Sequence, residues 1–194
     1  MANKITTALL SYGMSGEVFH GPLLNAHPQF EIGAVWQRNP AKAVKHSWPV
    51  AKDYKEILHN PAIELVVVNR PNDTHFKYAS EALEAGKHVV VEKPFTVTTA
   101  EADALIALAA EKKKVLSVFQ NRRWDADFLT VRKVLSEGLL GKLAECEIHY
   151  DRYRNYIEAN TWKEEAAPGT GILYNLGSHV IDQALVLFGM PNYL

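Results

Sequence analysis

Five short runs rich in β-branched residues recur in the first 121 residues, and they constrain the fold more than any other feature of the chain. Their valine-rich centres do not alternate with polar residues, which is typical of parallel strands that are buried on both faces. The runs are ITTALLSY (5–12), EIGAVWQ (31–37), IELVVVN (63–69), KHVVVEK (87–93) and VLSVFQN (115–121).

Helical patterns separate several of these runs. Residues 74–86 end on Gly86, a residue suited to a helix C-cap, and residues 98–114 open with threonines ahead of Glu101, which is an N-cap signature. Strands and helices that alternate at this spacing form crossover units. The sequence therefore predicts an α/β fold with a Rossmann-type, doubly wound parallel sheet.

The pattern changes after residue 121. Residues 125–138 have the pattern of a helix, and residues 142–153 that of a strand with one solvated face. A polar, irregular loop follows, and residues 171–189 then predict a mostly helical segment. One strand and one helix cannot bury their apolar faces alone. Either this part packs onto the first domain as an appendix, or the chain is a fragment of something longer.

Composition excludes several classes of function. The formal net charge of the 194 residues is −1, without a long run of one sign, so we expect neither nucleic acid nor an anionic membrane as a partner. The single cysteine, Cys146, excludes an internal disulfide and a cysteine-cluster metal site, and no histidines pair at metal-ligand spacing. No apolar run is long enough to span a membrane. We expect a cytoplasmic protein without a metal.

A glycine turn follows the first predicted strand. In SYGMSG (11–16), Gly13 and Gly16 stand where a G-x-G-x-x-G dinucleotide-binding loop has its second and third glycines, and Ser11 replaces the first. The second glycine lets a pyrophosphate approach the backbone, and the third lets helix and strand pack. The alternative is a glycine turn that binds no ligand.

The end of the second predicted strand bears on the cofactor. An acidic residue about 20 residues beyond the loop would hold the ribose 2′-hydroxyl of NAD, but this chain has Gln37 and Arg38 in VWQRNP. A neutral residue followed by arginine avoids repulsion of a 2′-phosphate and supplies a guanidinium to bind it. We therefore expect NADP, with NAD possible; the alternative is a surface arginine.

Three further motifs follow in a fixed order: NRPNDTH (69–75), VVVEKPF (89–95) and LGSHVID (176–182). Together with the glycine turn, this order resembles the Gfo/Idh/MocA family of NAD(P)-dependent oxidoreductases, and in detail its NADP-dependent scyllo-inositol dehydrogenase branch. The resemblance covers essentially the whole chain. It implies a nucleotide-binding domain at 1–121 and, at 122–194, the incomplete start of a substrate and oligomerisation domain.

Oxidation of a secondary alcohol requires a group that takes the hydroxyl proton while hydride leaves the same carbon. Lys93 follows a parallel strand at the edge where ligands of such sheets bind, and a desolvated lysine there can exchange a proton near neutrality. The resemblance implies this role for Lys93, a cis bond before Pro94, and an acid/base role for His179. The family's aspartate four residues before that histidine is Asn175 here, which can position an imidazole but cannot act as a base. The alternatives are a surface lysine and a buried core histidine.

The expected catalytic residues are therefore Lys93 and His179, with Asn175 positioning. The expected cofactor-binding residues are Tyr12, Gly13, Met14, Ser15, Gly16, Gln37, Arg38, Asn69, Pro71, Asn72, His75, Glu92, Lys93, Asn121 and Trp162. The predicted activity is hydride transfer between NADP(H) and a polyol, an inositol or a sugar-like secondary alcohol or ketone, in a homo-oligomer of the full-length protein. The alternatives are a non-catalytic nucleotide-binding module and an inactive fragment of the enzyme.

Overall fold

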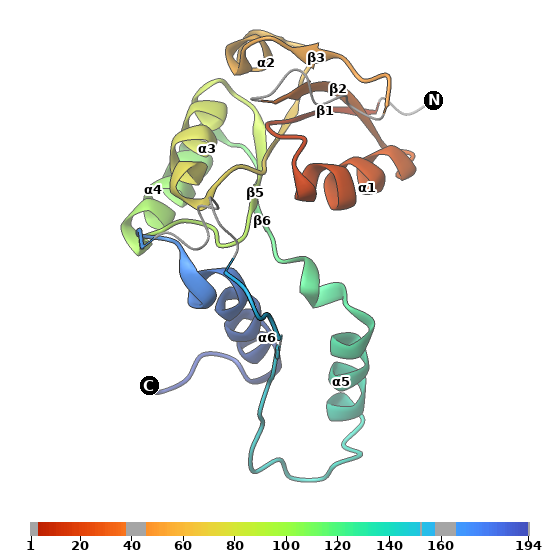
Figure 1. Ribbon diagram of the computed structural model, residues 1–194, viewed down its shortest axis with the longest axis vertical. Coiled ribbons are helices and arrows are strands. Elements are labelled where there is room, and N and C mark those ends of the chain that lie inside the picture. Colours follow the sequence, from red (N-terminus) through yellow and green to blue (C-terminus); the bar gives the residue numbers. More distant parts are fainter. Residues whose placement is uncertain (1–3, 38–45, 152, 158–165, 194) are drawn as a thin grey trace. The chain divides into compact units, whose positions relative to one another are not determined.

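The computed structural model describes residues 4–37, 46–151, 153–157 and 166–193. The chain divides into two compact units, Met1–Phe119 and Gln120–Leu194 (Figure 1).

The first unit is built on a six-stranded sheet in which every pair of neighbouring strands is parallel. The strands follow the order β3-β2-β1-β4-β5-β6, which is the doubly wound order of a Rossmann fold and confirms the predicted fold class. The order reverses between β1 and β4, so the carboxyl ends of these strands form the crevice where ligands of such sheets bind. The strands are β1 (Ile5–Leu9), β2 (Phe30–Trp36), β3 (Val50–Ala51), β4 (Leu65–Val68), β5 (His88–Glu92) and β6 (Leu116–Phe119).

Helices cover both faces of this sheet, as its non-alternating apolar strands require (Figure 1). On one face, Val66, Val68 and Val89 pack with residues of the helices α2, α3 and α4; on the other, Leu9, Val35 and Val67 pack with Leu24 of α1. The helical segments of this unit are η1 (Gly16–His20), α1 (Gly21–Ala26), α2 (Tyr54–His59), η2 (Asn72–Thr74), α3 (His75–Glu84) and α4 (Thr99–Lys112).

The local signals at the helix ends form as predicted. Thr98 and Glu101 make a reciprocal capping box at the start of α4, and Gly86 adopts a φ of +74° just after α3. The short strand β3 and the helix α2 were not predicted, because two residues of strand and six of helix leave too short a periodic pattern to recognise.

Gly33 interrupts the pairing of β1 with β2. Thr7 pairs with Ile32 and Ala8 with Ala34, so Gly33 is the extra residue of a bulge. A Cβ atom at this position would lie 2.4 Å from Cγ2 of Thr6. Glycine at this position therefore leaves the space that the methyl group of Thr6 occupies.

The second unit contains η3 (Asn121–Trp124), α5 (Ala126–Ser136), η4 (Leu173–Gly177) and α6 (Ser178–Phe188). A bidentate ion pair joins η3 to α6. Nε and Nη2 of Arg123 donate to Oδ2 and Oδ1 of Asp182, at 2.8 and 2.5 Å. These hydrogen bonds raise the pKa of Arg123, although partial burial acts in the opposite direction. A further hydrogen bond joins the same two elements, because Nε2 of Gln183 donates to the carbonyl oxygen of Arg122 at 3.2 Å.

The strand predicted at 142–153 does not form in the described residues. Residues 142–151 form no strand pairing with any described segment, and residues 142–147 are exposed, although the hydroxyl of Tyr150 donates to Oε1 of Gln183 at 3.1 Å. A strand needs a partner for its backbone N–H and C=O groups, and an alternating pattern cannot supply one. The helical prediction for 171–189 is confirmed by η4 and α6.

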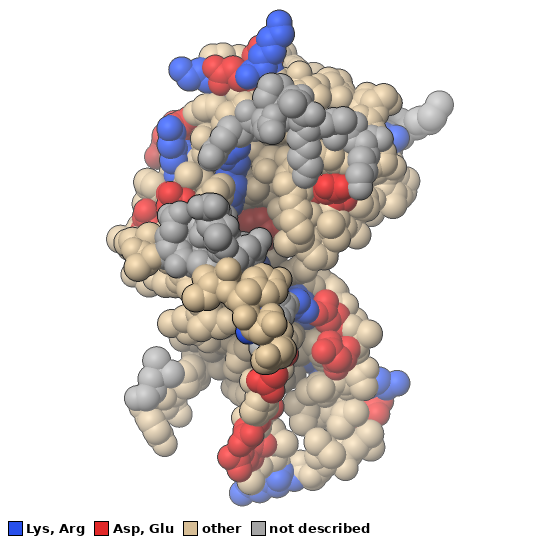
Figure 2. Space-filling view, viewed as in Figure 1, with Lys and Arg blue, Asp and Glu red and all other residues tan. Residues whose placement is uncertain are grey.

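On the face shown in Figure 2, the charged side chains of the described residues are of both signs and form no continuous basic patch. Among the helices described, none has both the length and the apolar character needed to cross a membrane.

The bulge gives the first testable prediction. Replacing Gly33 with alanine places a methyl group against Thr6, so we expect a loss of about 1–3 kcal/mol in the free energy of unfolding. Urea denaturation followed by circular dichroism measures it. Adding Thr6→Ser removes the obstructing methyl group and keeps the hydroxyl that binds Glu31, so it should restore much of the loss. A Gly33→Ala protein as stable as the wild type would contradict this account of the bulge.

Candidate functional site

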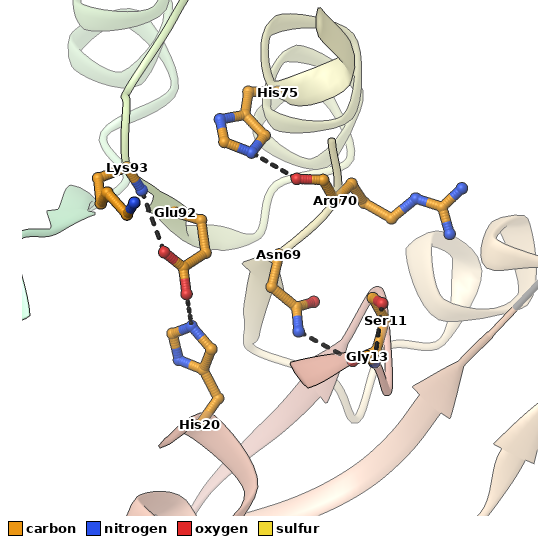
Figure 3. A network of polar contacts seen from close by, with 8 residues as sticks. All are labelled: Ser11, Gly13, His20, Asn69, Arg70, His75, Glu92 and Lys93. Carbon is orange, nitrogen blue, oxygen red and sulfur yellow. Dashed lines mark hydrogen bonds and ion pairs between the residues drawn. The ribbon is translucent and has the colours of Figure 1, made fainter. Parts of the chain in front are cut away.

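The turn after β1 is held together by hydrogen bonds around Ser11. Its hydroxyl accepts the backbone N–H of Gly13 at 3.1 Å, and its carbonyl accepts Nδ2 of Asn69 at 2.8 Å (Figure 3). Ser11 is not among the described residues with positive φ. The substitution at the first glycine position therefore keeps the tight turn, and the serine side chain adds a hydrogen bond that glycine lacks.

Gly16 lets the first helix start directly against this turn. A Cβ on Gly16 would lie 2.3 Å from the carbonyl oxygen of Ser11 and 3.0 Å from Nδ2 of Asn69. No side chain fits there without moving the backbone, which is the role of the third glycine in a dinucleotide-binding loop. Gly13 is different, because its Cβ would make only an ordinary contact at 3.4 Å with Oγ of Ser11.

Asn69 connects the ends of β4 and β1 and leaves one acceptor at the crevice. The residue is 6% exposed, and its Oδ1 has no hydrogen-bond partner within the described structure. Such an atom is costly to bury unless a donor reaches it, and hydroxyl or amide groups of a nucleotide are donors of the right kind. The sequence-predicted role of Asn69 fits this position.

A second polar network lies at the end of β5. Nε2 of His20, the last residue of η1, lies 2.9 Å from Oε1 of Glu92, and Oε2 of Glu92 accepts the backbone N–H of Lys93 at 3.2 Å (Figure 3). His20 is 4% exposed, and its ring packs on Phe119 with 4.2 Å between ring centroids. Both oxygens of Glu92 are therefore engaged, and the backbone of the half-buried Lys93 is held at the strand end. The Lys93–Pro94 bond is cis, as the resemblance implied.

His20 was not selected from the sequence. A signal was available, because His20 lies four residues after Gly16 and therefore about one helical turn further along the same side of η1. What the sequence did not show is that this side faces Glu92, which is 72 residues away along the chain.

His75 lies between the loops that follow β4 and β5. It is completely buried, with Nδ1 2.9 Å from the carbonyl oxygen of Pro94 and Nε2 2.8 Å from that of Arg70. These contacts hold the NRPNDTH and EKP loops side by side, so they fix Pro71 and Asn72 beside the strand end that carries Lys93. Direct contact of His75 with a cofactor stays a prediction.

The predicted site residues divide between the two units. Those of the first unit gather at the carboxyl ends of β1, β2, β4 and β5, and they include the buried Tyr12, the exposed Met14, and Ser15 and Gln37. Asn121, Asn175 and His179 belong to the second unit, where His179 is 4% exposed on α6 and Asn175 lies one turn earlier in η4. Arg38 and Trp162 lie outside the described residues. In the described part of the chain, no group of three or more His, Cys, Asp or Glu side chains could hold a metal ion.

Comparison with known proteins agrees with this geometry. Residues 5–120 match the family described as "Oxidoreductase family, NAD-binding Rossmann fold", and residues 128–193 match "GFO/IDH/MocA C-terminal domain". The chain belongs to the GFO/IDH/MocA oxidoreductase family.

Relatives in this family include scyllo-inositol 2-dehydrogenase (NADP(+)) IolW of Bacillus subtilis, which is 45% identical over 97% of this chain and 53% of its own length. Uncharacterized oxidoreductase YdgJ of Escherichia coli is 47% identical over 98% of this chain and 56% of its own. The solved structure of YPO2259 from Yersinia pestis superposes with a TM-score of 0.91 at 48% identity, covering 98% of this chain and 54% of that one. The chain thus spans about half the length of the GFO/IDH/MocA relatives that it matches.

The two glycines of the turn are expected to respond differently to alanine. Gly16→Ala forces η1 away from Ser11. It should therefore lower the urea midpoint, and it should weaken the binding of a nicotinamide nucleotide by about tenfold or more. Gly13→Ala has room for its methyl group but obstructs the approach of a pyrophosphate, so it should weaken binding with little change in stability. Unfolding curves and NADPH fluorescence titrations measure both. If Gly16→Ala changed neither quantity, this account of the turn would be wrong.

The contact between His20 and Glu92 should appear in a double-mutant cycle. His20→Leu leaves the mostly buried carboxylate of Glu92 without this partner, so we expect a destabilisation of about 1–3 kcal/mol. Adding Glu92→Leu removes the unpaired charge and should cost less than the sum of the two single changes. Urea midpoints of the four proteins give the coupling energy. A coupling near zero would mean that the contact contributes nothing to stability.

Proposed function

We propose that the protein containing this chain is an NADP(H)-dependent oxidoreductase that interconverts a secondary alcohol and a ketone on a polyol, an inositol or a sugar-like molecule. The observation that carries the proposal is the closure of the glycine turn on Asn69, next to the strand end that presents Lys93. This arrangement provides a nucleotide cradle and a proton-carrying side chain on neighbouring strands.

The residues of the first unit fit a nicotinamide dinucleotide. Gly16 packs where a side chain would clash with the carbonyl of Ser11, and Oδ1 of Asn69 is a buried acceptor without a described partner. When bound, the nicotinamide supplies or accepts the hydride. The preference for NADP is supported by the absence of a carboxylate at Gln37 and Arg38, and by the similarity to IolW, whose name includes NADP(+).

Proton transfer is assigned to Lys93 and His179. The backbone of Lys93 is held by Glu92, which is held in turn by His20, so the start of its side chain is fixed at the sheet edge. His179 lies on α6, which the Arg123–Asp182 pair ties to the segment after β6. Asn175 is one turn before His179 and is proposed to orient it, since an amide offers hydrogen bonds without charge.

The substrate class rests on similarity alone, and polyhydroxylated compounds are proposed because IolW is named for an inositol. We further propose a homo-oligomer of the full-length protein in a reducing compartment such as the cytoplasm, where the exposed thiol of Cys146 would persist.

A second function, a nucleotide-binding module without turnover, is favoured by Asn175. The family resemblance places an aspartate there, and an amide cannot stabilise a charged imidazole as a carboxylate does. This protein would bind NADPH but would not oxidise it with any carbonyl compound.

Binding and turnover together test the proposal. We expect NADPH to bind this chain at least about tenfold more tightly than NADH in fluorescence titrations, because a 2′-phosphate forms charge-assisted hydrogen bonds. In a chain extended to the length of its relatives, a panel of polyols should reduce NADP, and Lys93→Met or His179→Ala should lower kcat by about 100-fold or more. Full activity in the double variant would refute the assignment, and NADPH binding without any turnover would favour the second function.

A further inference from the structure

Arg70 crosses the nucleotide edge of the sheet. It follows β4, yet its guanidinium carbon lies 4.3 Å from the ring centroid of Trp36, the last residue of β2. Because β1 separates β4 from β2, the side chain must pass over the carboxyl end of β1. Nη1 of Arg70 donates to the carbonyl of Leu10 at 3.3 Å on the way, and Figure 3 shows the side chain extending above the Ser11 turn.

The guanidinium is held over an aromatic platform. Trp36 packs against Tyr54 and Tyr78 with ring centroids 5.3 and 5.8 Å apart, and Tyr78 also lies 5.3 Å from the guanidinium carbon. Stacking engages the faces of these groups, whereas phosphate oxygens bind the N–H groups at the guanidinium edge. The platform therefore reduces the entropy that Arg70 would lose on gripping an anion, while its edge keeps the geometry that anions require.

We propose that Arg70 is a specificity-determining residue that binds the 2′-phosphate of NADP(H). This inference rests on the proposed function and adds to it a residue from a different strand. In this fold the end of β2 is where the 2′ position of the adenosine ribose is recognised, and Arg70 carries its charge to Trp36, the residue directly before Gln37 and Arg38. The guanidinium of Arg70 thus reaches the end of β2, for which the sequence alone had suggested Arg38 as the phosphate-binding residue.

Two other roles for Arg70 make different predictions. If Arg70 stacked on the adenine ring, it would strengthen NADPH and NADH binding equally, because both carry adenine. If it only braced Trp36 and the end of β1, its loss would lower stability. Neither role would change the ratio of the NADPH and NADH affinities. A change in that ratio therefore distinguishes phosphate binding from both.

The test compares Arg70→Met, which keeps a long side chain over Trp36 without the charge, with Arg70→Lys, which keeps the charge without the planar fork. Lys77→Met is the matched control, because Nζ of Lys77 lies 5.6 Å from the Tyr78 ring but the residue is exposed on α3. NADPH and NADH are titrated by fluorescence for all four proteins. Displacement of NADPH by 2′,5′-ADP and by 5′-AMP isolates the phosphate, and urea midpoints report folding.

We expect Arg70→Met to weaken binding of NADPH and 2′,5′-ADP by about tenfold or more, with NADH and 5′-AMP changed by less than about twofold. Arg70→Lys should lose less, and Lys77→Met should behave like the wild type. Equal weakening of both cofactors, or an unchanged ratio of their affinities in Arg70→Met, would overturn the inference while leaving the proposed NADPH preference in place. A wild-type protein that does not prefer NADPH would instead show that the proposed function itself is wrong, and the inference with it.

Discussion

The hydrogen bond from Nδ2 of Asn69 to the carbonyl of Ser11 is the contact on which the rest of the site depends. It joins the ends of β1 and β4 at the point where the strand order reverses. Gly16 packs against the same carbonyl, so the start of η1, the glycine turn and the residue after β4 meet around one oxygen atom. This arrangement positions the start of η1, where backbone N–H groups of a dinucleotide-binding loop face the phosphates.

From this point the structure extends along the sheet edge in two directions. Toward β5, Nε2 of His20 in η1 contacts the carboxylate of Glu92, and this carboxylate accepts the backbone N–H of Lys93. Toward β2, Arg70 passes over β1 to the Trp36 platform. His75 joins the loops after β4 and β5 through two main-chain oxygens. Lys93, proposed to carry the proton, thus follows β5, whereas Arg70, proposed to select the nucleotide, reaches the end of β2 on the other side of β1 and β4.

Much of the fold could be predicted from the sequence because its signals are local. The five longer strands, the capping box of Thr98 and Glu101, and the helix near the C-terminal end of the chain all leave patterns within a few residues. The segment 142–153 shows the limit of such patterns, since alternation describes two faces of a strand but not the neighbour that must pair with it. The bulge at Gly33 was equally hidden, because it depends on the side chain of Thr6 in another strand.

The candidate site divides along the same line. The sequence by itself determined the family, the glycine turn and the identity of Lys93, because these are carried by residue types at short, recognisable spacings. Only the tertiary structure decided that Ser11 completes the turn with its own hydroxyl and that His20 faces Glu92. It also decided that the guanidinium of Arg70 stacks on Trp36 at the end of β2, although Arg70 follows β4. The physical reason is that hydrogen bonds and stacking act over a few ångströms in space, and the sheet brings together side chains that the chain separates by tens of residues.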